Sequence, residues 1–438
     1  MKKSQNNYVI RVLNSPLEVQ KDDWNTLLSV QRPDGVMNPF MRHEYLAAMH
    51  ESDSATPKTG WTPHFVTLWD GHQLAGACAL YLKTHSYGEY VFDHAWANAY
   101  HQHGLAYYPK ALVAAPFTPV PGARLLARTA AERVLLVEAL IAWCSEQQLS
   151  SLHLLFVADD DIAACEASGL MLRHTVQFHW KNQAQPALPS AGDEASARPA
   201  RPARFTTFDD FLGSLSQEKR KKIRQERRKV ADAGITFRWS LGSGITTQDW
   251  DFFYRCYERT YYEHGNAPYL SRDFFAHMQA DMPGNWLLFV AEHTAADGTR
   301  QAIATSLIAI SEAKTLAGGI NGTENDPLTT PVGLTAYGRY WGALARVDCL
   351  HFEACYYQPL AWCIAHGVDT FEGGAQGEHK MARALLPVKT TSAHWLAHPS
   401  FADAVERFLE REGDGIANYM EELEKRNPYR QAPPPALP

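Results

Sequence analysis

The chain of 438 residues has few cysteines, and none of them forms a pattern typical of cysteine chemistry. The seven cysteines are odd in number, scattered along the sequence, and include no C-x-x-C pair. This distribution argues against a disulfide framework and against a structural zinc site. We therefore expect a reducing compartment and no bound metal.

The sequence also lacks a run of apolar residues long enough for a membrane helix. The longest such run, Val134 to Cys144, contains Glu138 and is shorter than the ~20 residues that a spanning helix needs. The N-terminal segment MKKSQNNYVIRVL becomes polar after its two lysines, whereas a secretory signal continues with an apolar core. These features predict a soluble, cytoplasmic protein that is not inserted in a membrane.

Several common catalytic motifs are missing as well. The sequence has no G-x-S-x-G, no H-E-x-x-H, no Ser-His-Asp order and no Walker spacing, so covalent nucleophilic catalysis and metal catalysis lack support. Lys and Arg number 41 against 48 Asp and Glu, a net charge of -7, so binding of a polyanion would need a local basic patch. Length and an ordinary composition predict two or three globular domains.

What the first half does contain is a regular succession of helical and strand patterns. Asp70-Gly71 lies between two apolar runs and predicts a β-hairpin. Asn38 and Pro39 stand in the order expected for the cap and the first turn of a helix. The expected elements are helices over 15–30 and 38–50, the hairpin over 64–83, a helix over 131–148, a strand over 152–158, a helix containing 163–168, and a strand over 170–180. This order is typical of a mixed sheet covered by helices.

The second half repeats this plan after a segment rich in Ala, Pro, Ser and Arg. It is predicted to have helices over 216–230, 249–265 and 334–344, and strands over 234–241, 285–293, 301–310 and 314–320. Asp297-Gly298 would join the strands over 285–293 and 301–310. A strand end is predicted to lead into a helix over 350–367, and a strand to break into a glycine turn over 368–380. We therefore predict a mixed α/β protein with two tandem domains over 1–182 and 205–430. A linker or insertion over 183–204 would join them, and 431–438 would be a disordered tail.

The glycine turn, FEGGAQGEHKMAR, is the most specific segment. Its glycines would let the backbone approach a ligand, and successive N–H groups would form a nest for a donor phosphate or an oxyanion. The residues that follow would supply a base, a proton carrier and a cation. The candidates are Gly373, Gly374 and Gly377 for the nest, Glu378 and His379 for catalysis, and Gln376 and Lys380 for substrate binding. The alternative is a strand-to-helix turn with solvated charges.

A second candidate is Glu353 in LHFEACYYQPLAWCI. Apolar neighbours would disfavour its ionised form and raise its pKa, as a general base requires. Equally, Glu353 could cap the following helix or pair with an arginine such as Arg339. Tyr356, Tyr357 and Gln358 could line an acceptor pocket with Arg339, although the two tyrosines could also be packed in the core.

In the first half, HSYGEYVFDHAWANAY places aromatic rings around carboxylates. Such a mixture suits recognition of an amine or a sugar, with Glu89, Tyr90 and Asp93 as the binding residues. The alternative is an aromatic core with carboxylates at its rim, and this interpretation is preferred for Trp96 and Tyr100.

One basic patch is visible. Eight basic residues lie between Lys219 and Lys229, in a helical pattern that directs Ile223 and Val230 inward. Arg220, Arg224 and Arg228 could contact RNA phosphates. The interspersed glutamates also fit a merely solvated helix face.

Beyond these local patterns, the sequence resembles the FemAB-like family of the GNAT superfamily. The resemblance lies in LYLKTHSYGEYVFDHAWANAY, YYPKALVAAPFTPV, KRKKIRQERRKV, YGRYWG, LHFEACYYQPLAWCIAHG and FEGGAQGEHKMARALLP, from about residue 38 to about residue 412. It implies two tandem GNAT-like domains and transfer of an acyl or aminoacyl group from acyl-CoA or aminoacyl-tRNA. The [QR]-x-x-G-x-[GA] spacing of GNAT donor loops is not cleanly present in either half.

Together, the residues and the resemblance predict an N-acyltransferase of peptidoglycan biosynthesis. A small-molecule or peptide amine would attack the acyl group directly, with Glu353, Glu378 or His379 accepting its proton and the backbone near Gly374 stabilising the oxyanion. The alternative is a non-catalytic protein that retains the fold and binds peptide, glycan or RNA.

Overall fold

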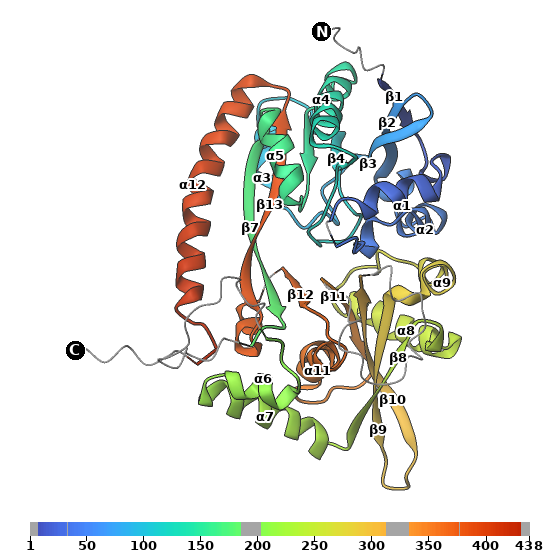
Figure 1. Cartoon of the computed structure of the whole chain (residues 1–438), viewed down its shortest axis with the longest axis vertical. Coiled ribbons are helices and arrows are strands. Elements are labelled where there is room, and N and C mark those ends of the chain that lie inside the picture. The colour runs from blue at the N-terminus through green and yellow to red at the C-terminus, as the bar shows by residue number, and fades with distance from the viewer. Residues whose placement is uncertain (1–7, 33, 185–202, 312–332, 376, 431–438) are drawn as a thin grey trace, which may run out of the picture. The chain divides into compact units, whose positions relative to one another are not determined.

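The computed structural model describes residues 8–32, 34–184, 203–311, 333–375 and 377–430. The chain forms two compact units that do not consist of consecutive halves (Figure 1). The first unit comprises the chain up to Val176, Pro268–Pro283 and Lys389–Glu421. The second comprises Gln177–Ala267, Gly284–Val388 and the chain from Glu422.

The first unit is a mixed sheet with helices. Its strand order is β1-β2-β3-β4-β6-β13-β7, with β5 paired to β3. Only β4 and β6 are parallel neighbours among the strand pairs described for this unit. Its elements are β1 (Tyr8–Leu13), α1 (Lys21–Ser29), α2 (His43–Glu51), β2 (Trp61–Asp70), β3 (Gln73–Lys83), α3 (His94–Gln102), β4 (Lys110–Val113), β5 (Leu126–Ala127), α4 (Ala130–Glu146), β6 (Ser151–Leu154), α5 (Asp159–Ala167), the start of β7 (Met171–Lys181), α9 (Arg272–Asp281), most of β13 (Leu386–Leu396) and most of α12 (Pro399–Glu424).

Two hydrophobic clusters contribute to the core of this unit. Apolar residues of β3, β4, β6 and α4, among them Leu80, Val113, Leu136 and Leu152, form one continuous buried cluster. Burial of such side chains stabilises by ~1.5–3 kcal/mol each. A second cluster joins Trp96 and Tyr100 of α3 with apolar residues of α12. The predicted hairpin is confirmed, because Asp70 pairs with Gln73 across the turn.

The second unit repeats the plan of the first. Its strand order is β7-β12-β11-β10-β9-β8, and β11 and β12 are parallel. Its elements are the end of β7, α6 (Phe208–Ser214), α7 (Gln217–Asp232), β8 (Ile235–Leu241), α8 (Thr247–Glu263), β9 (Trp286–Thr294), β10 (Arg300–Ile310), β11 (Thr335–Ala343), α10 (Leu350–Phe352), the π-helix η6 (Glu353–Tyr357), α11 (Gln358–Ala365), β12 (Thr370–Ala375) and the 3-10 helix η7 (Glu378–Arg383). The hairpin predicted at Asp297-Gly298 is confirmed as β9 and β10.

The two halves of the sequence exchange their last strands. Within the first unit, the end of β13 pairs antiparallel with β6, from Ala393 opposite Leu154 to Leu396 opposite Ser151. Within the second unit, the end of β7 pairs antiparallel with β12. Each mixed sheet is therefore completed by a strand from the other half of the chain. This exchange explains why the compact units differ from the predicted division at 182 and 205.

One predicted helix is wrong. Residues 334–344 were expected to be helical, but Thr335–Ala343 is the strand β11, between β10 and β12. Gly338 and Gly342 occupy places where a Cβ would lie 2.9 Å from the Phe371 ring and 2.0 Å from the Cys256 carbonyl oxygen. The glycines serve close packing, while Thr, Tyr and Trp favour a pleated strand.

The mixed α/β class with helices flanking mixed sheets is confirmed. The predicted strand over 314–320, most of the 183–204 linker and the 431–438 tail lie outside the described residues. In the part of the chain that the structure describes, no helix combines the length and apolar character that crossing a bilayer requires.

Candidate functional site

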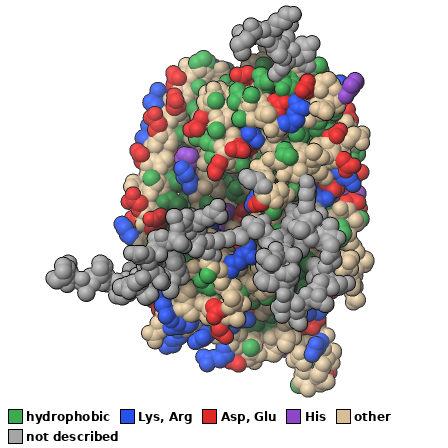
Figure 2. Space-filling view, in the orientation of Figure 1, with side chains coloured by type: hydrophobic (Ala, Val, Ile, Leu, Met, Phe, Trp, Pro, Cys, Tyr) green, Lys and Arg blue, Asp and Glu red, His purple; other side chains and the backbone are tan. Residues whose placement is uncertain are grey.

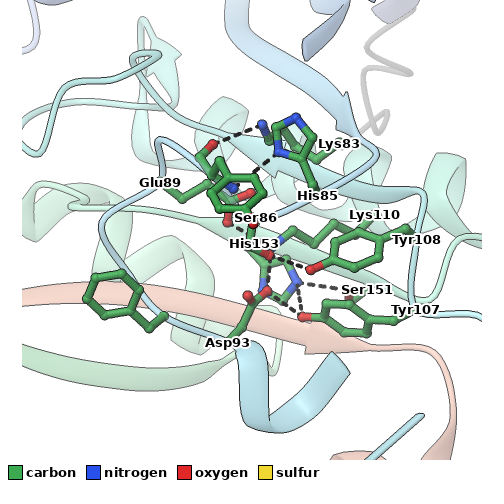
Figure 3. Close-up of polar contacts among 12 residues, drawn as sticks. Lys83, His85, Ser86, Glu89, Asp93, Tyr107, Tyr108, Lys110, Ser151 and His153 are labelled. Atoms are coloured by element: carbon green, nitrogen blue, oxygen red, sulfur yellow. Dashed lines mark hydrogen bonds and ion pairs between the residues drawn. The ribbon is translucent and has the colours of Figure 1, made fainter. Parts of the chain in front are cut away.

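The first unit contains a buried network of charged side chains on the segment between β3 and α3 (Figure 3). Lys110, at the first position of β4, is fully buried. Its Nζ donates to Glu89 Oε2 at 2.7 Å, to Ser86 Oγ at 2.8 Å, and to Asp93 Oδ2. Lys110 thus brings together Glu89 and Asp93, the two carboxylates predicted to bind substrate. Lys110 itself was not among the predicted residues.

The charges of this network are strongly shifted by burial. Desolvation raises the pKa of Glu89 to about 7 despite the nearby Lys110. For Asp93, the same desolvation is outweighed by Lys110 and His153, and its pKa falls below the ordinary value. Burial alone would lower the pKa of Lys110, but Glu89 and Asp93 raise it. The network therefore contains the ion pair of Lys110 with Asp93, and the carboxyl of Glu89, which titrates near neutral pH.

Two buried histidines extend the network. Tyr107 Oη donates to Asp93 Oδ2 at 2.6 Å and lies 3.1 Å from His153 Nε2. The other ring nitrogen of His153, Nδ1, lies 2.8 Å from His394 Nδ1, which β13 brings from 241 residues away. Burial lowers the pKa of His153 to about 3 and that of His394 well below its usual value. Both imidazoles are therefore neutral.

A second lysine and several aromatic rings surround the network. Lys83 Nζ lies 3.7 Å from the centre of the Trp61 ring, and burial lowers the pKa of this amine to about 7. Outside, Tyr87 and Phe92 are 67% and 57% exposed, and Tyr90 is 36% exposed with a positive φ of 64°. The segment therefore carries aromatic rings that are exposed to solvent and carboxylates that are buried. Trp96 and Tyr100, in contrast, are buried.

In the second unit, the glycine turn begins at the end of β12, which includes Gly373 and Gly374. Gly374 and Gly377 have positive φ values of 74° and 94°, a conformation that favours glycine. Lys380 is buried, its Nζ donates to the Gly374 carbonyl oxygen at 3.2 Å, and burial lowers its pKa to about 8. At Gly373 a Cβ would lie 2.3 Å from Leu385. The turn is thus held by its own lysine, and Gln376 lies outside the described residues.

The two predicted catalytic residues that follow the turn are on the surface. Glu378 is exposed and forms an ion pair of 2.6 Å with Arg426. His379 is exposed too, and its Nε2 lies 3.2 Å from the hydroxyl of the buried Tyr356. Neither residue has the enclosed surroundings from which a tuned general base usually benefits.

Glu353 lies in a very different environment. It is buried at the first position of the π-helix η6, a rare element that often occurs at functional sites. Its Oε1 accepts hydrogen bonds from Arg227 Nε at 3.1 Å and from Gln358 Nε2 at 2.7 Å. Burial raises the pKa of Glu353, although both partners oppose the shift. The arginine that pairs with it is Arg227, from the basic helix, rather than Arg339 of β11.

Glu353 lines a groove of about 500 Å³ within the second unit. Gln358 lines the same groove, together with Arg224, Arg227 and Arg228 of α7. Two residues predicted to contact RNA therefore lie beside a predicted base and a predicted substrate-binding residue. Apolar side chains of α7 and β8, such as Val230, Ile235 and Phe237, complete the lining.

The basic helix α7 carries its charges on the surface of the second unit, where Figure 2 shows Lys and Arg side chains gathered at the lower left. Arg224 and Arg228 are exposed, and Arg220 is half-buried. One face of the helix is buried through Ile223, Val230 and Glu226. Glu226 receives hydrogen bonds from Tyr357 and from Arg383, which lies over the Phe352 ring at 3.5 Å.

Several partners in these networks were not predicted from the sequence: the buried Lys110, His153, His394, Glu226 and Arg383, and the half-buried Arg227. Of these, Arg227 and Glu226 could have been found, because Arg224, Arg227 and Arg228 recur at helical spacing and Glu226 shares the inward face with Ile223 and Val230. Among the described residues, no group of three or more His, Cys, Asp or Glu side chains could hold a metal ion.

Comparison with known proteins gives a family. The sequence matches the FemAB-like family model, described as peptidoglycan biosynthesis/recognition, over residues 15–188 and 200–431. No curated protein matches it.

Similar solved structures include FemX, with 9% identity, a TM-score of 0.48, and coverage of 89% of this chain and 98% of that one. The C-terminal domain of a putative lysylphosphatidylglycerol synthetase from Agrobacterium fabrum has 8% identity, a TM-score of 0.49, and coverage of 90% and 97%. A tandem GNAT protein from the clavulanic acid biosynthesis pathway has 12% identity, a TM-score of 0.42, and coverage of 90% and 99%. The family model spans nearly the whole sequence, and the chain belongs to the FemAB-like family.

Proposed function

We propose that the chain transfers an acyl or aminoacyl group from a phosphate-bearing donor to an amine of a peptidoglycan precursor, in the groove lined by Glu353. The transferase class and the link to peptidoglycan synthesis follow from the family. One observation supports this location: the buried Glu353, whose pKa is raised, lines the same groove as the exposed Arg224 and Arg228. Acyl-CoA and aminoacyl-tRNA both bring the phosphates and the activated acyl group that this groove would serve.

The arginines supply the donor site. Arg224 and Arg228 line the groove with their charged groups toward solvent, and guanidinium groups pair well with phosphate oxygens. Asp209 lies 3.7 Å from Arg224, a weak contact between two exposed groups that a phosphate could displace. Phe237 offers an apolar surface in the same groove.

Glu353 supplies the proton acceptor. An attacking amine must lose a proton as its nitrogen bonds to the acyl carbon, and a carboxyl whose pKa is raised toward neutrality accepts that proton well. The bond from the acyl carbon to the donor's sulfur or oxygen then breaks, and the same carboxyl returns the proton to the leaving group. Gln358 and Arg227 hold Glu353 in place through these steps. No covalent enzyme intermediate is required.

The buried network of the first unit suits a different role in this proposal. Glu89 and Asp93 have one oxygen each, Oε1 and Oδ1, that is buried and accepts no hydrogen bond from any described residue. The exposed Tyr87, Tyr90 and Phe92 lie on the same segment. The aromatic rings are the accessible part of this segment, and we propose that they bind a peptide or an amine within the first unit. The glycine turn near Gly374 is not among the residues that line the Glu353 groove, and its role as an oxyanion site stays a prediction.

The test uses purified full-length chain and a UDP-linked muramyl pentapeptide as acceptor, with acetyl-CoA or a pool of charged tRNA as donor. Product is detected by mass spectrometry. Glu353→Gln keeps the shape and both hydrogen-bonding neighbours, and should reduce kcat by 10²-fold or more, in the range of general-base catalysis. The matched control is Glu378→Gln on the surface, which should retain most activity.

Equal loss in the two variants, or none in Glu353→Gln, would remove Glu353 as the base. Binding of donor or acceptor without turnover under all conditions would favour the alternative, a non-catalytic binding protein. Replacing Arg224 and Arg228 by Gln should raise KM for the donor and weaken its salt dependence while kcat changes little.

A further inference from the structure

The first unit has a groove of about 780 Å³ that the proposed function does not use. One wall is α12, the helix along the left side of Figure 1, and the other is formed by the start of β7 and the end of α5. The half-buried Met171 and Leu172 contribute apolar surface from the strand side, next to the buried Leu170. The groove lies within one compact unit.

The helix wall is a single face of α12. The lining residues Glu406, Leu409, Gly413, Ala417 and Met420 follow one another at intervals of three or four, so they lie along one side of the helix. These residues extend over four turns, about 21 Å of helix axis. The N-terminal part of α12 packs against α3, through Val405 and Leu409.

The side of α12 that lines the groove carries small and apolar side chains over its C-terminal part. Gly413 and Ala417 have little or no side chain, so the backbone of another segment could approach closely at these positions. Ile416 and Met420 line the groove nearby. The shape and length therefore fit a helix that lays an apolar face into a groove, a common mode of peptide recognition.

The rim of the groove is acidic. Four carboxylates line it, from Glu166, Glu406, Glu410 and Asp414, while Lys389 is the basic residue among the lining side chains. The remaining titratable group, His174, has its pKa lowered by burial and by Lys389, so it adds no positive charge at neutral pH. The rim thus carries a net charge of about -3.

We propose that this groove binds a basic amphipathic helix of a partner protein. Such a helix would bury its apolar side against Met171, Leu172 and Met420 and place its Lys or Arg side chains beside the acidic rim. A second copy of this chain does not fit. Its α12 would bring carboxylates against carboxylates, and the apolar face of its basic helix α7 is already buried through Ile223 and Val230. An anionic membrane surface would be repelled.

The proposal is tested with the full-length chain and a fluorescently labelled 14-residue peptide of Leu and Lys in helical order. Binding is followed by fluorescence anisotropy. The double variant Glu410→Lys with Asp414→Lys should weaken binding at least 10-fold, and Ala417→Trp, which fills the groove without changing its charge, should do the same. The matched control is Asp403→Lys, an exposed position of α12 outside the groove, which should change affinity less than 2-fold.

Circular dichroism of each variant shows whether α12 is intact, and any variant that unfolds is replaced by Met420→Gln. A peptide of Leu and Glu, and vesicles with anionic headgroups, should not bind. The proposal is overturned if the Leu and Lys peptide does not bind. It is equally overturned if Asp403→Lys weakens binding as much as the groove variants do, since the attraction would then be only the overall charge.

Discussion

Lys110 is the residue on which the buried network of the first unit depends. It is fully buried between Glu89 and Asp93, and without its cation the ionised Asp93 would be left as an uncompensated buried charge. Lys110→Met should therefore lower the free energy of unfolding of the first unit by about 3–5 kcal/mol. Urea denaturation followed by near-ultraviolet circular dichroism measures the change.

A surface ion pair provides the control for this prediction. Lys58 and Asp53 lie 2.7 Å apart, but their side chains are 77% and 61% exposed. Lys58→Met should change stability by less than about 1 kcal/mol, because water screens an exposed pair. Similar effects of the two lysine substitutions would show that the network contributes no more than a surface contact.

The buried histidines predict a loss of stability in acid. The pKa of His153 lies near 3 in the folded chain because of burial, so between about pH 3 and the ordinary histidine value the unfolded chain binds more protons. The free energy of unfolding then rises with pH across this window. At pH 5, the low pKa of His153 alone lowers the free energy of unfolding by about 2 kcal/mol. Urea midpoints at pH 7 and pH 5 should differ less in His153→Gln than in the unaltered chain. Exposed His72→Gln should leave the difference unchanged.

Residue by residue, the sequence indicated the chemistry of this network but not its partners. Glu89 and Asp93 stand out because carboxylates among aromatic rings are unusual, and the structure does place them together. Lys110 and His394 belong to segments with no such signal. They meet the carboxylates only because β4 and β13 flank β6, a pairing that spans the chain. Local patterns hold no information of that kind.

At the scale of elements, β11 illustrates how a glycine can serve packing. A Cβ at Gly342 would lie 2.0 Å from the Cys256 carbonyl oxygen of α8, and backbone cannot move aside as a flexible side chain can. Gly342→Ala should therefore force α8 and β11 apart and destabilise the second unit by about 1–3 kcal/mol. The control is Gly213→Ala in α6, where nothing lies within 4 Å of the added Cβ. This variant should stabilise by about 0.5–1 kcal/mol, because alanine is the better helix former. Thermal unfolding distinguishes the opposite signs.

Comparing the two hairpins with β11 shows which elements could be predicted from local sequence. Both hairpins could be predicted from their Asp-Gly turns, because this dipeptide favours the backbone geometry of a tight hairpin turn. Residues 334–344 have apolar and aromatic side chains at spacings that also fit a helix, and only their burial between β10 and β12 decides for a strand. The π-helix η6 likewise follows from packing and has no signature in LHFEACYYQPL.

At the scale of the molecule, the repeat of one plan in both halves could be read from the sequence, while the exchange of the last strands could not. The sequence predicts β7 as the last strand of its own half, over 170–180, and predicts no element over the residues of β13. Their pairing with β12 and β6 depends on which sheet edge each reaches, a property of the whole chain. The predicted boundaries near 182 and 205 therefore describe the repeat in the sequence and not the compact units.

The exchange predicts that the first half cannot fold alone. A fragment ending at residue 182 lacks β13, so β6 would lose its antiparallel neighbour, and it lacks α12, so Trp96 and Tyr100 would lose their apolar cover. The expressed fragment should show poor near-ultraviolet circular dichroism and rapid hydrogen exchange in β6, whereas β6 of the full chain stays protected. Mixing with a fragment from residue 203 onward should restore protection by supplying β13 and α12. A cooperative thermal transition of the first fragment alone would show that β13 is dispensable, and the units would then be independent domains.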